Sequence, residues 1–335
     1  MSGVRLRPLQ GRTSKANLKA RPEDVMVYFL ATSAPFFAVI FLGWLAGRRG
    51  MFDLSAVRIL NGFAFFVATP ALITRVMARE PILELFNLKF FLGLAGVGVL
   101  QMALIAFIMR RFGGQTADAA ISRGQACVGP NFAFLGIPLM LAFLGDDAPA
   151  PIALGLLVDN AIIIPLSIGL IRALQEGGGD RGRLMGELAR GTLFNPFMLS
   201  IAAGSTLSIL GLVPVGPLDR FLVFLGNAAP PTGVFALGLA LSGWGLQGRL
   251  SAAAPLLLAK LVMHPLLVAL VLMLLGLGPS WIMAGVIYAA LPTAANVFII
   301  AERFRTDPET VAATIVLSTA LASLTFPFTL WMVAG

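Results

Sequence analysis

The strongest constraint in this sequence is its succession of long apolar runs, because about 20 apolar residues are enough for one helix to cross a bilayer. Ten such runs follow one another from residue 26 onward. They cover 26–47, 55–76, 88–110, 117–144, 149–173, 191–213, 217–243, 251–276, 279–303 and 309–334. Only 12% of the residues are charged, whereas soluble domains are about 25% charged. The sequence therefore predicts an all-α integral membrane protein with ten transmembrane helices.

Composition argues against several other classes of protein. A single cysteine and a single histidine leave no disulfide framework, zinc site or iron–sulfur cluster, so no metal is expected. No phosphate-binding P-loop occurs, and Asp146-Asp147 stand alone where a metal-dependent lipid-modifying enzyme would need paired acidic motifs. The net charge of +8 comes from basic residues in the tail and short loops, which favours lipid headgroups over nucleic acid as partners.

The prolines and glycines indicate an internal repeat. A polar tract at 175–190 separates two sets of five runs, 26–174 and 191–335. Corresponding residues recur at an offset of 161 or 162: Pro35 and Pro196, Gly43 and Gly204, Pro70 and Pro231, Pro165 and Pro327. Because five is odd, the second set must enter the membrane from the opposite side. Such inverted repeats are common in secondary transporters, and a linker at 175–190 joins the two sets here.

The fourth and ninth runs are both interrupted. The stretch GPNFAFLGIPLM at 129–140 sets proline, glycine and asparagine inside an apolar run, and the offset of 161 carries Asn131 to Pro292 in YAALPTAANVFIIAERF at 288–304. Proline removes a backbone donor and breaks a helix. Unwound backbone at membrane depth is tolerated only where it is buried in protein or lines a watery cavity. A simple kink is the alternative at the other prolines, whereas here a binding site is favoured.

The chemistry of these breaks favours a carboxylate ligand. Half-helices that begin after a break direct N–H groups and a positive dipole end toward the cavity, and asparagine and threonine add neutral hydrogen-bonding groups. The candidate substrate-binding residues are Gly129, Pro130, Asn131, Pro292, Thr293 and Asn296. Mono- and dicarboxylates both fit this pattern. No acidic cluster suggests sodium coupling, although backbone carbonyls alone can bind sodium.

Several stretches resemble the auxin efflux carrier family, which includes bacterial carriers proposed for malate, malonate and other organic acids. They are GRRGMFDLSAVRILNGFAFFVATPALI (47–73), NFAFLGIPL (131–139), NPFMLSIAAG (195–204) and ALPTAANVFIIAERF (290–304). The resemblance implies ten spans in two inverted repeats, with helices 1, 2, 6 and 7 as a scaffold and helices 3–5 and 8–10 as a mobile transport domain. It also implies that broken helices 4 and 9 cross at Pro130-Asn131 and Pro292, as in the related bile acid sodium symporters, and that a homodimer forms through the scaffold.

Few ionisable residues lie inside the runs, and such residues are functional candidates because they are costly in a membrane. Asp159 and Asn160 lie in run 5, and Lys260 and His264 lie one helical turn apart, on one face of run 8. We expect Asp159 to pair with Lys260 as a coupling device for a proton or an anionic substrate. A structural ion pair or a snorkelling lysine is the alternative, and a lone His264 is more often a hydrogen-bonded packing residue than a proton relay. Gln101 is expected to make an interhelical hydrogen bond.

Loop charges predict the orientation. With the chain starting outside, thirteen Lys or Arg residues flank the cytoplasmic ends of the runs and four flank the other ends, which places both termini outside and the linker inside. The basic tail at 1–25 carries six more and opposes this orientation, unless Met26 is the native start or the tail is translocated. It resembles a signal peptide's basic region, but the following apolar run is too long for one.

Together these features predict a secondary active carrier of small organic anions in the plasma membrane, the inner membrane of a bacterium. Transport would use alternating access at the crossover of the two broken helices, and no cofactor is required. The alternatives are a membrane-embedded sensor, a lipid-modifying enzyme and a channel, of which the channel fits paired broken helices less well.

Overall fold

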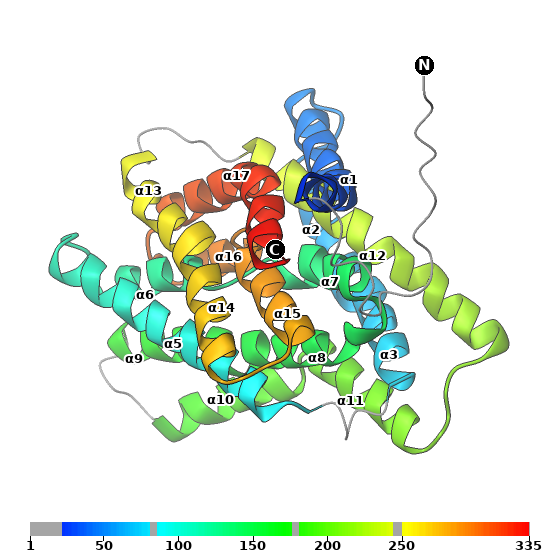
Figure 1. Ribbon diagram of the computed structural model, residues 1–335. Coiled ribbons are helices and arrows are strands. Elements are labelled where there is room, and N and C mark those ends of the chain that lie inside the picture. Colours follow the sequence, from blue (N-terminus) through cyan, green and yellow to red (C-terminus); the bar gives the residue numbers. More distant parts are fainter. Residues whose placement is uncertain (1–21, 81–85, 176–180, 244–249, 335) are drawn as a thin grey trace.

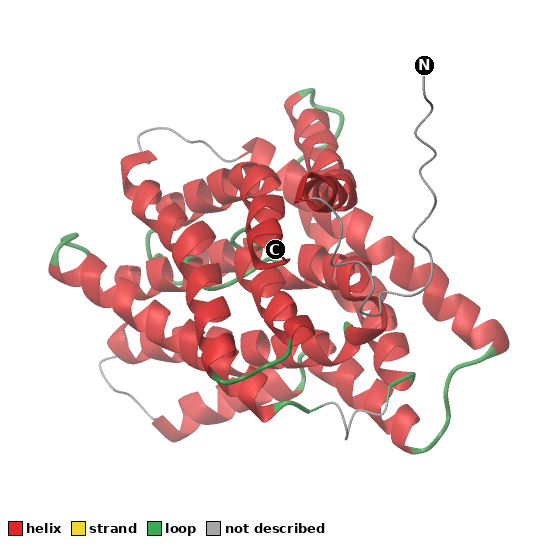
Figure 2. Cartoon of the chain, in the orientation of Figure 1, coloured by secondary structure: helices red, strands yellow, loops and turns green. Residues whose placement is uncertain are grey.

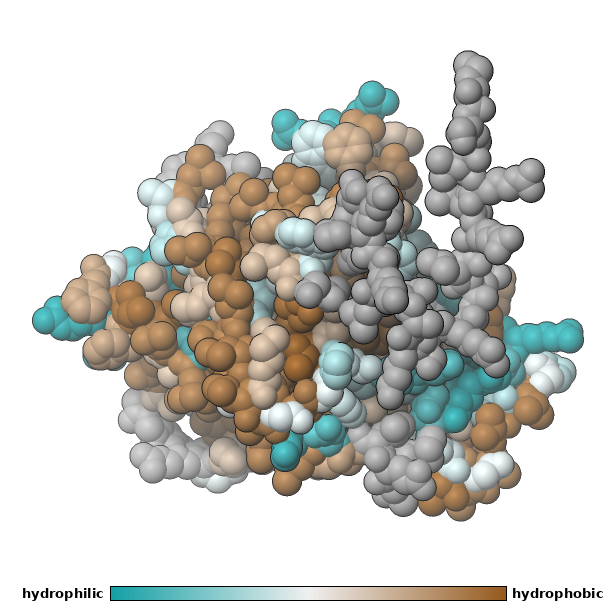
Figure 3. Space-filling view, viewed as in Figure 1, coloured by the Kyte–Doolittle hydropathy of each residue, from teal (hydrophilic) through white to brown (hydrophobic). Residues whose placement is uncertain are grey.

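The computed structural model describes residues 22–80, 86–175, 181–243 and 250–334. Within these residues every regular element is a helix, which confirms the all-α prediction (Figures 1 and 2). The continuous α-helices are α1 (Pro22–Arg48), α5 (Leu88–Arg111), α10 (Arg181–Leu193), α11 (Pro196–Ile209), α12 (Gly216–Gly243) and α17 (Pro308–Ala334). On the face seen in Figure 3, broad apolar surface lies over α14 and α15, as lipid contact requires.

Other apolar runs fold as composite helices. Ser55–Phe63 (α2), Ala64–Ala68 (η1) and Thr69–Ala78 (α3) form one, and Pro149–Leu157 (α8), Val158–Ile163 (η4) and Ile164–Gln175 (α9) form another. A third consists of Leu250–Leu258 (α13), Ala259–Met263 (η5) and His264–Leu274 (α14). Among the described residues, seven helices are long and apolar enough to cross a membrane, or eight if the bent pair α10–α11 is one span. The ten-helix inverted repeat therefore stays a prediction.

The fourth and ninth runs are broken, as predicted. The fourth consists of Ala117–Ala126 (α6), a non-helical stretch, then Phe132–Gly136 (η2) and Ile137–Leu144 (α7). The ninth consists of Pro279–Ala290 (α15) and Ala295–Arg303 (α16). Each half is shorter than a bilayer requires, so neither run qualifies as one continuous span. The predicted linker at 175–190 is not only a loop, because residues 181–193 form the helix α10.

Four prolines produce one recurrent local structure. The π-helical turns η1, η2, η4 and η5 each end two residues before a proline. These prolines are Pro70, Pro138, Pro165 and Pro265. A proline lacks the N–H that would continue the α-helical ladder and its ring crowds the preceding turn, and a wider turn with one extra residue relieves both problems. The following α-helix then starts with proline near its first position, where no donor is needed.

Two glycine contacts bring the helices of the expected scaffold together. A Cβ atom on Gly43 of α1 would lie 2.2 Å from the carbonyl oxygen of Phe235 in α12. A Cβ atom on Gly204 of α11 would lie 2.6 Å from the carbonyl oxygen of Thr74 in α3. Adding 161 to 43 gives 204, and adding 161 to 74 gives 235. The offset found in the sequence thus relates one helix contact to the other.

Candidate functional site

The two broken helices meet at their breaks. The backbone N–H of Asn131 donates to the carbonyl oxygen of Pro292 at 2.8 Å, and that of Ala294 donates to the carbonyl oxygen of Gly129 at 3.1 Å. Pro130 and Thr293 form an antiparallel bridge between these hydrogen bonds. Asn131 and Pro292 are also the pair that the offset of 161 relates. Each unwound segment therefore satisfies backbone groups of the other, which explains how both can be unwound inside the protein.

Side chains cap the half-helices that end at the crossing. The Thr293 hydroxyl donates to the carbonyl oxygen of Ala126 at 2.8 Å, at the C-terminus of α6. The Lys260 Nζ atom donates to the carbonyl oxygen of Ala289 at 3.0 Å, at the C-terminus of α15. Carbonyl groups at a helix C-terminus lack intrahelical partners and carry a partial negative charge. A hydroxyl donor at one end and a lysine side-chain donor at the other therefore stabilise the two breaks.

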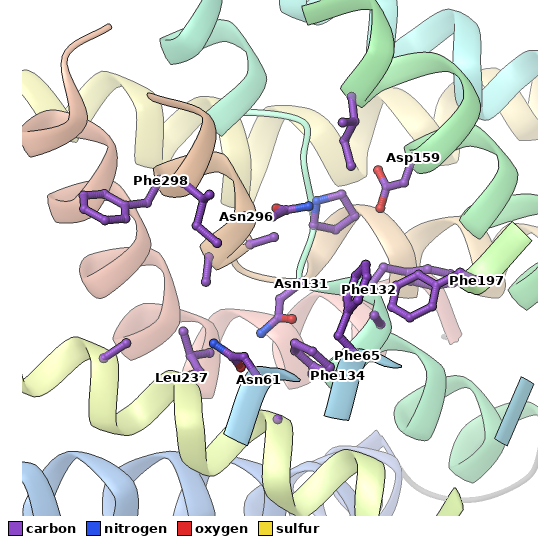
Figure 4. Close-up of a pocket in the computed structure, with 18 of the residues that line it drawn as sticks. Asn61, Phe65, Asn131, Phe132, Phe134, Asp159, Phe197, Leu237, Asn296 and Phe298 are labelled. Atoms are coloured by element: carbon purple, nitrogen blue, oxygen red, sulfur yellow. The ribbon is translucent and has the colours of Figure 1, made fainter. Parts of the chain in front are cut away.

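A cavity of about 280 Å³ lies beside the crossing, between its backbone and the helices α2, η1, α11 and α12. Its polar side chains are Asn61, Asn131, Asp159, Asn160 and Asn296, and its aromatic ones are Phe65, Phe132, Phe134, Phe197 and Phe298. In Figure 4 the Asn61 and Asn131 amides lie near each other. Amide groups on an aromatic wall suit a small ligand that combines a carboxylate with an apolar part.

The predicted binding residues divide into two groups. Pro130, Asn131 and Asn296 line the cavity. Gly129, Pro292 and Thr293 do not line it, and they form the crossing behind it through the backbone and hydroxyl bonds above. A Cβ atom on Gly129 would lie 3.1 Å from Val297 Cγ2, a close contact that favours glycine at this position. These three residues therefore hold Pro130, Asn131 and Asn296 in place beside the cavity.

Asn61 is the polar lining residue that sequence reasoning missed. It lies on α2, and it shares one helix face with Leu54 and Val57, which also line the cavity. The sequence feature that could have indicated Asn61 is that its side chain is an amide within the apolar run 55–76, four residues before Phe65 of η1. No local pattern says that this face meets the crossing, because only the packing of α2 against the rest of the protein decides it.

The expected ion pair between Asp159 and Lys260 is not formed. Asp159 Oδ1 accepts a hydrogen bond from the Tyr288 hydroxyl at 2.8 Å, and Lys260 bonds Ala289 instead. Tyr288 and Ala289 are adjacent residues, so both side chains bond the same end of α15. Asp159 lines the cavity, whereas Lys260 is completely buried and does not line it.

His264 and Lys260 contact different neighbouring helices. Its Nδ1 atom lies 2.8 Å from Oε1 of Gln101 in α5, while Lys260 contacts α15. Lys260 lies within the π-helical turn η5, which runs from residue 259 to 263, and His264 directly follows it. Residues four apart lie close to one face of such a turn, and from that face the two side chains reach different neighbouring helices. Gln101 Nε2 also donates to the carbonyl oxygen of Ala259 at 2.8 Å, which confirms the interhelical hydrogen bond.

Replacement of Gln101 by leucine is expected to destabilise the protein by about 2 kcal/mol or more, because it leaves Ala259 and the buried His264 ring without these bonds. His264 Nε2 already lacks a partner among the described residues. Thermal unfolding in detergent measures the effect. Gln115→Leu is the control, since Gln115 bonds only the exposed carbonyl of Gly113. Equal melting temperatures for the two variants would contradict the prediction.

A second cavity of about 420 Å³ adjoins the first and shares Asn160 and Asn296 with it. It is lined by α10 and by Arg172, Glu187 and Arg303. Asn195 Nδ2 donates to Asn160 Oδ1 at 3.1 Å between the two cavities. The two cavities therefore adjoin each other on the side of the crossing where α10 lies.

An all-helical membrane protein with a polar cavity where two broken helices meet has the features of a membrane transport protein. The sequence matches the family described as "Membrane transport protein" over residues 28–179 and 183–331. The chain belongs to this family, the auxin efflux carrier family. The similarity covers nearly all of the described residues, both breaks included.

Individual relatives agree with this assignment. The chain is 34% identical, over 89% of its length and 94% of the relative, to a protein of Rhizobium meliloti named "Putative malonate transporter". It is 25% identical, over 92% of its length and 98% of the relative, to "Uncharacterized transporter YfdV" of Escherichia coli K12. It is 24% identical to mouse "Lysosomal cholesterol signaling protein", over 88% of the chain but 36% of that protein. The two bacterial relatives are named as transporters, which indicates a non-enzymatic transport protein.

Proposed function

We propose that this protein is a secondary active carrier of small organic anions, with mono- or dicarboxylates as substrates and the cavity beside the crossing as the substrate site. The observation that carries the proposal is the position of Asn131 and Asn296. Each belongs to a different broken helix, and both line one cavity. A carboxylate there would accept hydrogen bonds from both amides and face the N-terminal end of α16.

The proposed mechanism is alternating access. The cavity lies between α2, α11 and α12, which belong to the proposed scaffold, and the crossing, which belongs to the proposed transport domain. The offset of 161 that relates the two glycine contacts and the crossing itself supports an inverted repeat of five helices in each half. The cavity adjoins a second one beside α10, and positive-inside counting puts α10 in the cytoplasm. Both support an inward-facing state of a plasma membrane carrier with external termini as part of the proposal.

Two further parts of the proposal concern coupling and assembly. Asp159 is the proposed coupling group, because it is the ionisable residue of the cavity, and Lys260 supports the crossing rather than binding the substrate. A homodimer would form through α1, α3, α11 and α12. The relative in Rhizobium meliloti that is named for malonate supports a small dicarboxylate as the first substrate to test.

The test is flux in proteoliposomes. We expect saturable uptake or efflux of radiolabelled malonate, malate or indole-acetate, measured with and without a proton gradient. Asn131→Ala combined with Asn296→Ala should raise KM or reduce flux about 100-fold, because two hydrogen bonds to a charged group are lost. Asn227→Ala is the matched control, since Asn227 is exposed on α12 and lies outside the cavity.

The possible results separate the functions. Unchanged flux in the double variant would show that the substrate binds elsewhere. Absence of flux for every acid, with correctly folded protein, would favour a sensor that binds without transporting. That alternative has one specific observation in its favour, the similarity to a mouse protein named for cholesterol signalling, and the 36% coverage of that protein leaves its remaining parts without a counterpart here.

A further inference from the structure

The charges around the cavity limit the charge of its ligand. Among the described residues that line the 280 Å³ cavity, Asp159 is the ionisable one, and no lysine, arginine or histidine lines it. Lys260 lies outside and bonds the carbonyl of Ala289. Arg172 and Arg303 line the adjoining cavity, where Arg172 is bound to Glu187 at 2.5 Å. A ligand in the first cavity therefore meets amide donors and one carboxyl group.

The position of Asp159 is fixed by its contacts. Tyr288 donates to its Oδ1 atom, and Oδ2 receives no hydrogen bond from the described residues. In Figure 4 the carboxyl group points into the region between η4 and the crossing. The Asp159 side chain belongs to η4, in which Asn160 uses its own amide to bond Leu156 and Asn195. Asp159 therefore has one oxygen left for a ligand.

The elements packed against Asp159 bring no cation into direct contact with it. The turn η4 packs against α5, α8 and α9, and α15 adds Tyr288. The titratable residues on these elements are Lys89, Arg110 and Arg111 at the ends of α5, Arg172 in the last turn of α9, and Tyr288. Tyr288 is the one with a hydrogen bond to Asp159. The buried Lys260 Nζ atom donates to the carbonyl oxygen of Ala289.

A monocarboxylate and a dicarboxylate place different demands on this arrangement. A monocarboxylate can bind Asn131 and Asn296 and direct its remaining part toward the aromatic wall. In a dicarboxylate the second carboxylate would lie beside Asp159, and two negative carboxylates in direct contact in a poorly solvated site repel each other strongly. One proton between them turns the repulsion into an O–H···O hydrogen bond.

We propose that Asp159 is a specificity-determining residue that requires one bound proton for each dicarboxylate and none for a monocarboxylate. The inference rests on the proposed function, because it uses the same cavity. The proton comes from solution, either on the second carboxyl group of the ligand or on Asp159, and lies between the two groups in the complex. It leaves with the dicarboxylate, so the carrier moves a dicarboxylate together with one proton.

The test compares malonate with its monoamide, malonamate, which has one carboxylate and a neutral amide of similar size. Binding to purified protein in nanodiscs is measured by calorimetry from about pH 6.5 to about pH 9. The apparent Kd of malonate should increase with pH and approach a tenfold change per pH unit at the alkaline end, because one proton is taken up with the ligand. The Kd of malonamate should stay constant over the same range.

Variants then assign the proton to its site. Asp159→Asn should bind malonate with a Kd that no longer depends on pH, since the amide donates to the second carboxylate without a proton from solution. Asp146→Asn, a carboxylate change outside this cavity, should keep the wild-type slope. A constant malonate Kd in the wild type, or an unchanged slope in Asp159→Asn, would overturn the inference. If either of these results occurs while malonamate still binds, only the inference is overturned and the carrier proposal stands. If neither malonate nor malonamate binds, the inference and the proposed function are both overturned.

The wild-type comparison also decides the inference if the Asp159→Asn variant does not fold. Malonate and malonamate are measured on the same protein, so the difference between their slopes decides the inference without Asp159→Asn. Equal slopes for the two ligands would contradict a proton requirement at the second carboxylate.

Discussion

Gly238→Leu is expected to abolish folding of the protein, with a loss of about 5 kcal/mol or more in the free energy of unfolding. A Cβ atom at residue 238 would lie 1.9 Å from the carbonyl oxygen of Ile40 and 2.9 Å from the backbone nitrogen of Trp44. Both are backbone atoms of α1, which cannot rotate away as a side chain can. The helices α1 and α12 would have to separate along their whole contact.

The control for this prediction is Gly96→Leu. Gly96 also lies within a long apolar helix, α5, but its Cβ atom would meet nothing within 4 Å. That variant should fold, because removing a helical glycine restricts the unfolded chain without a clash. Size-exclusion chromatography of fluorescent fusions and melting curves in detergent measure both variants. A monodisperse Gly238→Leu protein with wild-type melting temperature would show that α1 and α12 do not pack as described.

Arg123→Met is expected to destabilise the protein by about 3–5 kcal/mol, the usual effect of leaving one member of a buried ion pair alone. The Arg123 Nε and Nη2 atoms both donate to Asp307 Oδ2, at 2.8 and 2.6 Å, and the arginine side chain is only 7% exposed. Asp307 belongs to the loop between α16 and α17 and has a φ angle of 59°. The pair therefore joins α6, from the first broken helix, to the end of the second.

A double-mutant cycle tests the origin of this effect. Arg123→Met with Asp307→Asn should recover most of the stability, because no unpaired charge remains and asparagine tolerates the positive φ angle. Arg183→Met is the control, since its partner Glu187 lies in an exposed pair whose loss should cost less than about 1 kcal/mol. Chemical denaturation in mixed micelles gives the free energies. Additive effects of Arg123→Met and Asp307→Asn would show that the ion pair is not what stabilises this loop.

Features of the chain that depend on local chemistry could be predicted from the sequence. Apolar length predicted a helical membrane protein, and the family resemblance is confirmed by the match over most of the chain. Proline beside glycine and asparagine located both breaks, because a missing N–H interrupts a helix wherever the rest of the chain lies. The offset of 161 pairs Asn131 with Pro292 in the sequence, and these two residues are hydrogen-bonded in the structure. The use of this site by a substrate remains a proposal.

Tertiary structure alone decided which side chains meet. Asn61 reaches the cavity, Asp159 bonds Tyr288, and Lys260 caps α15, and none of these partners follows from sequence spacing. The physical reason is that each partner lies on another helix, so the contact depends on how the two helices are rotated and packed and not on the spacing within either one. The sequence by itself determined that this protein spans a membrane and where its helices break, because both depend on local hydrophobicity and backbone donors. Helix rotation and packing decided the partners, because a buried polar group bonds whatever the neighbouring helix presents.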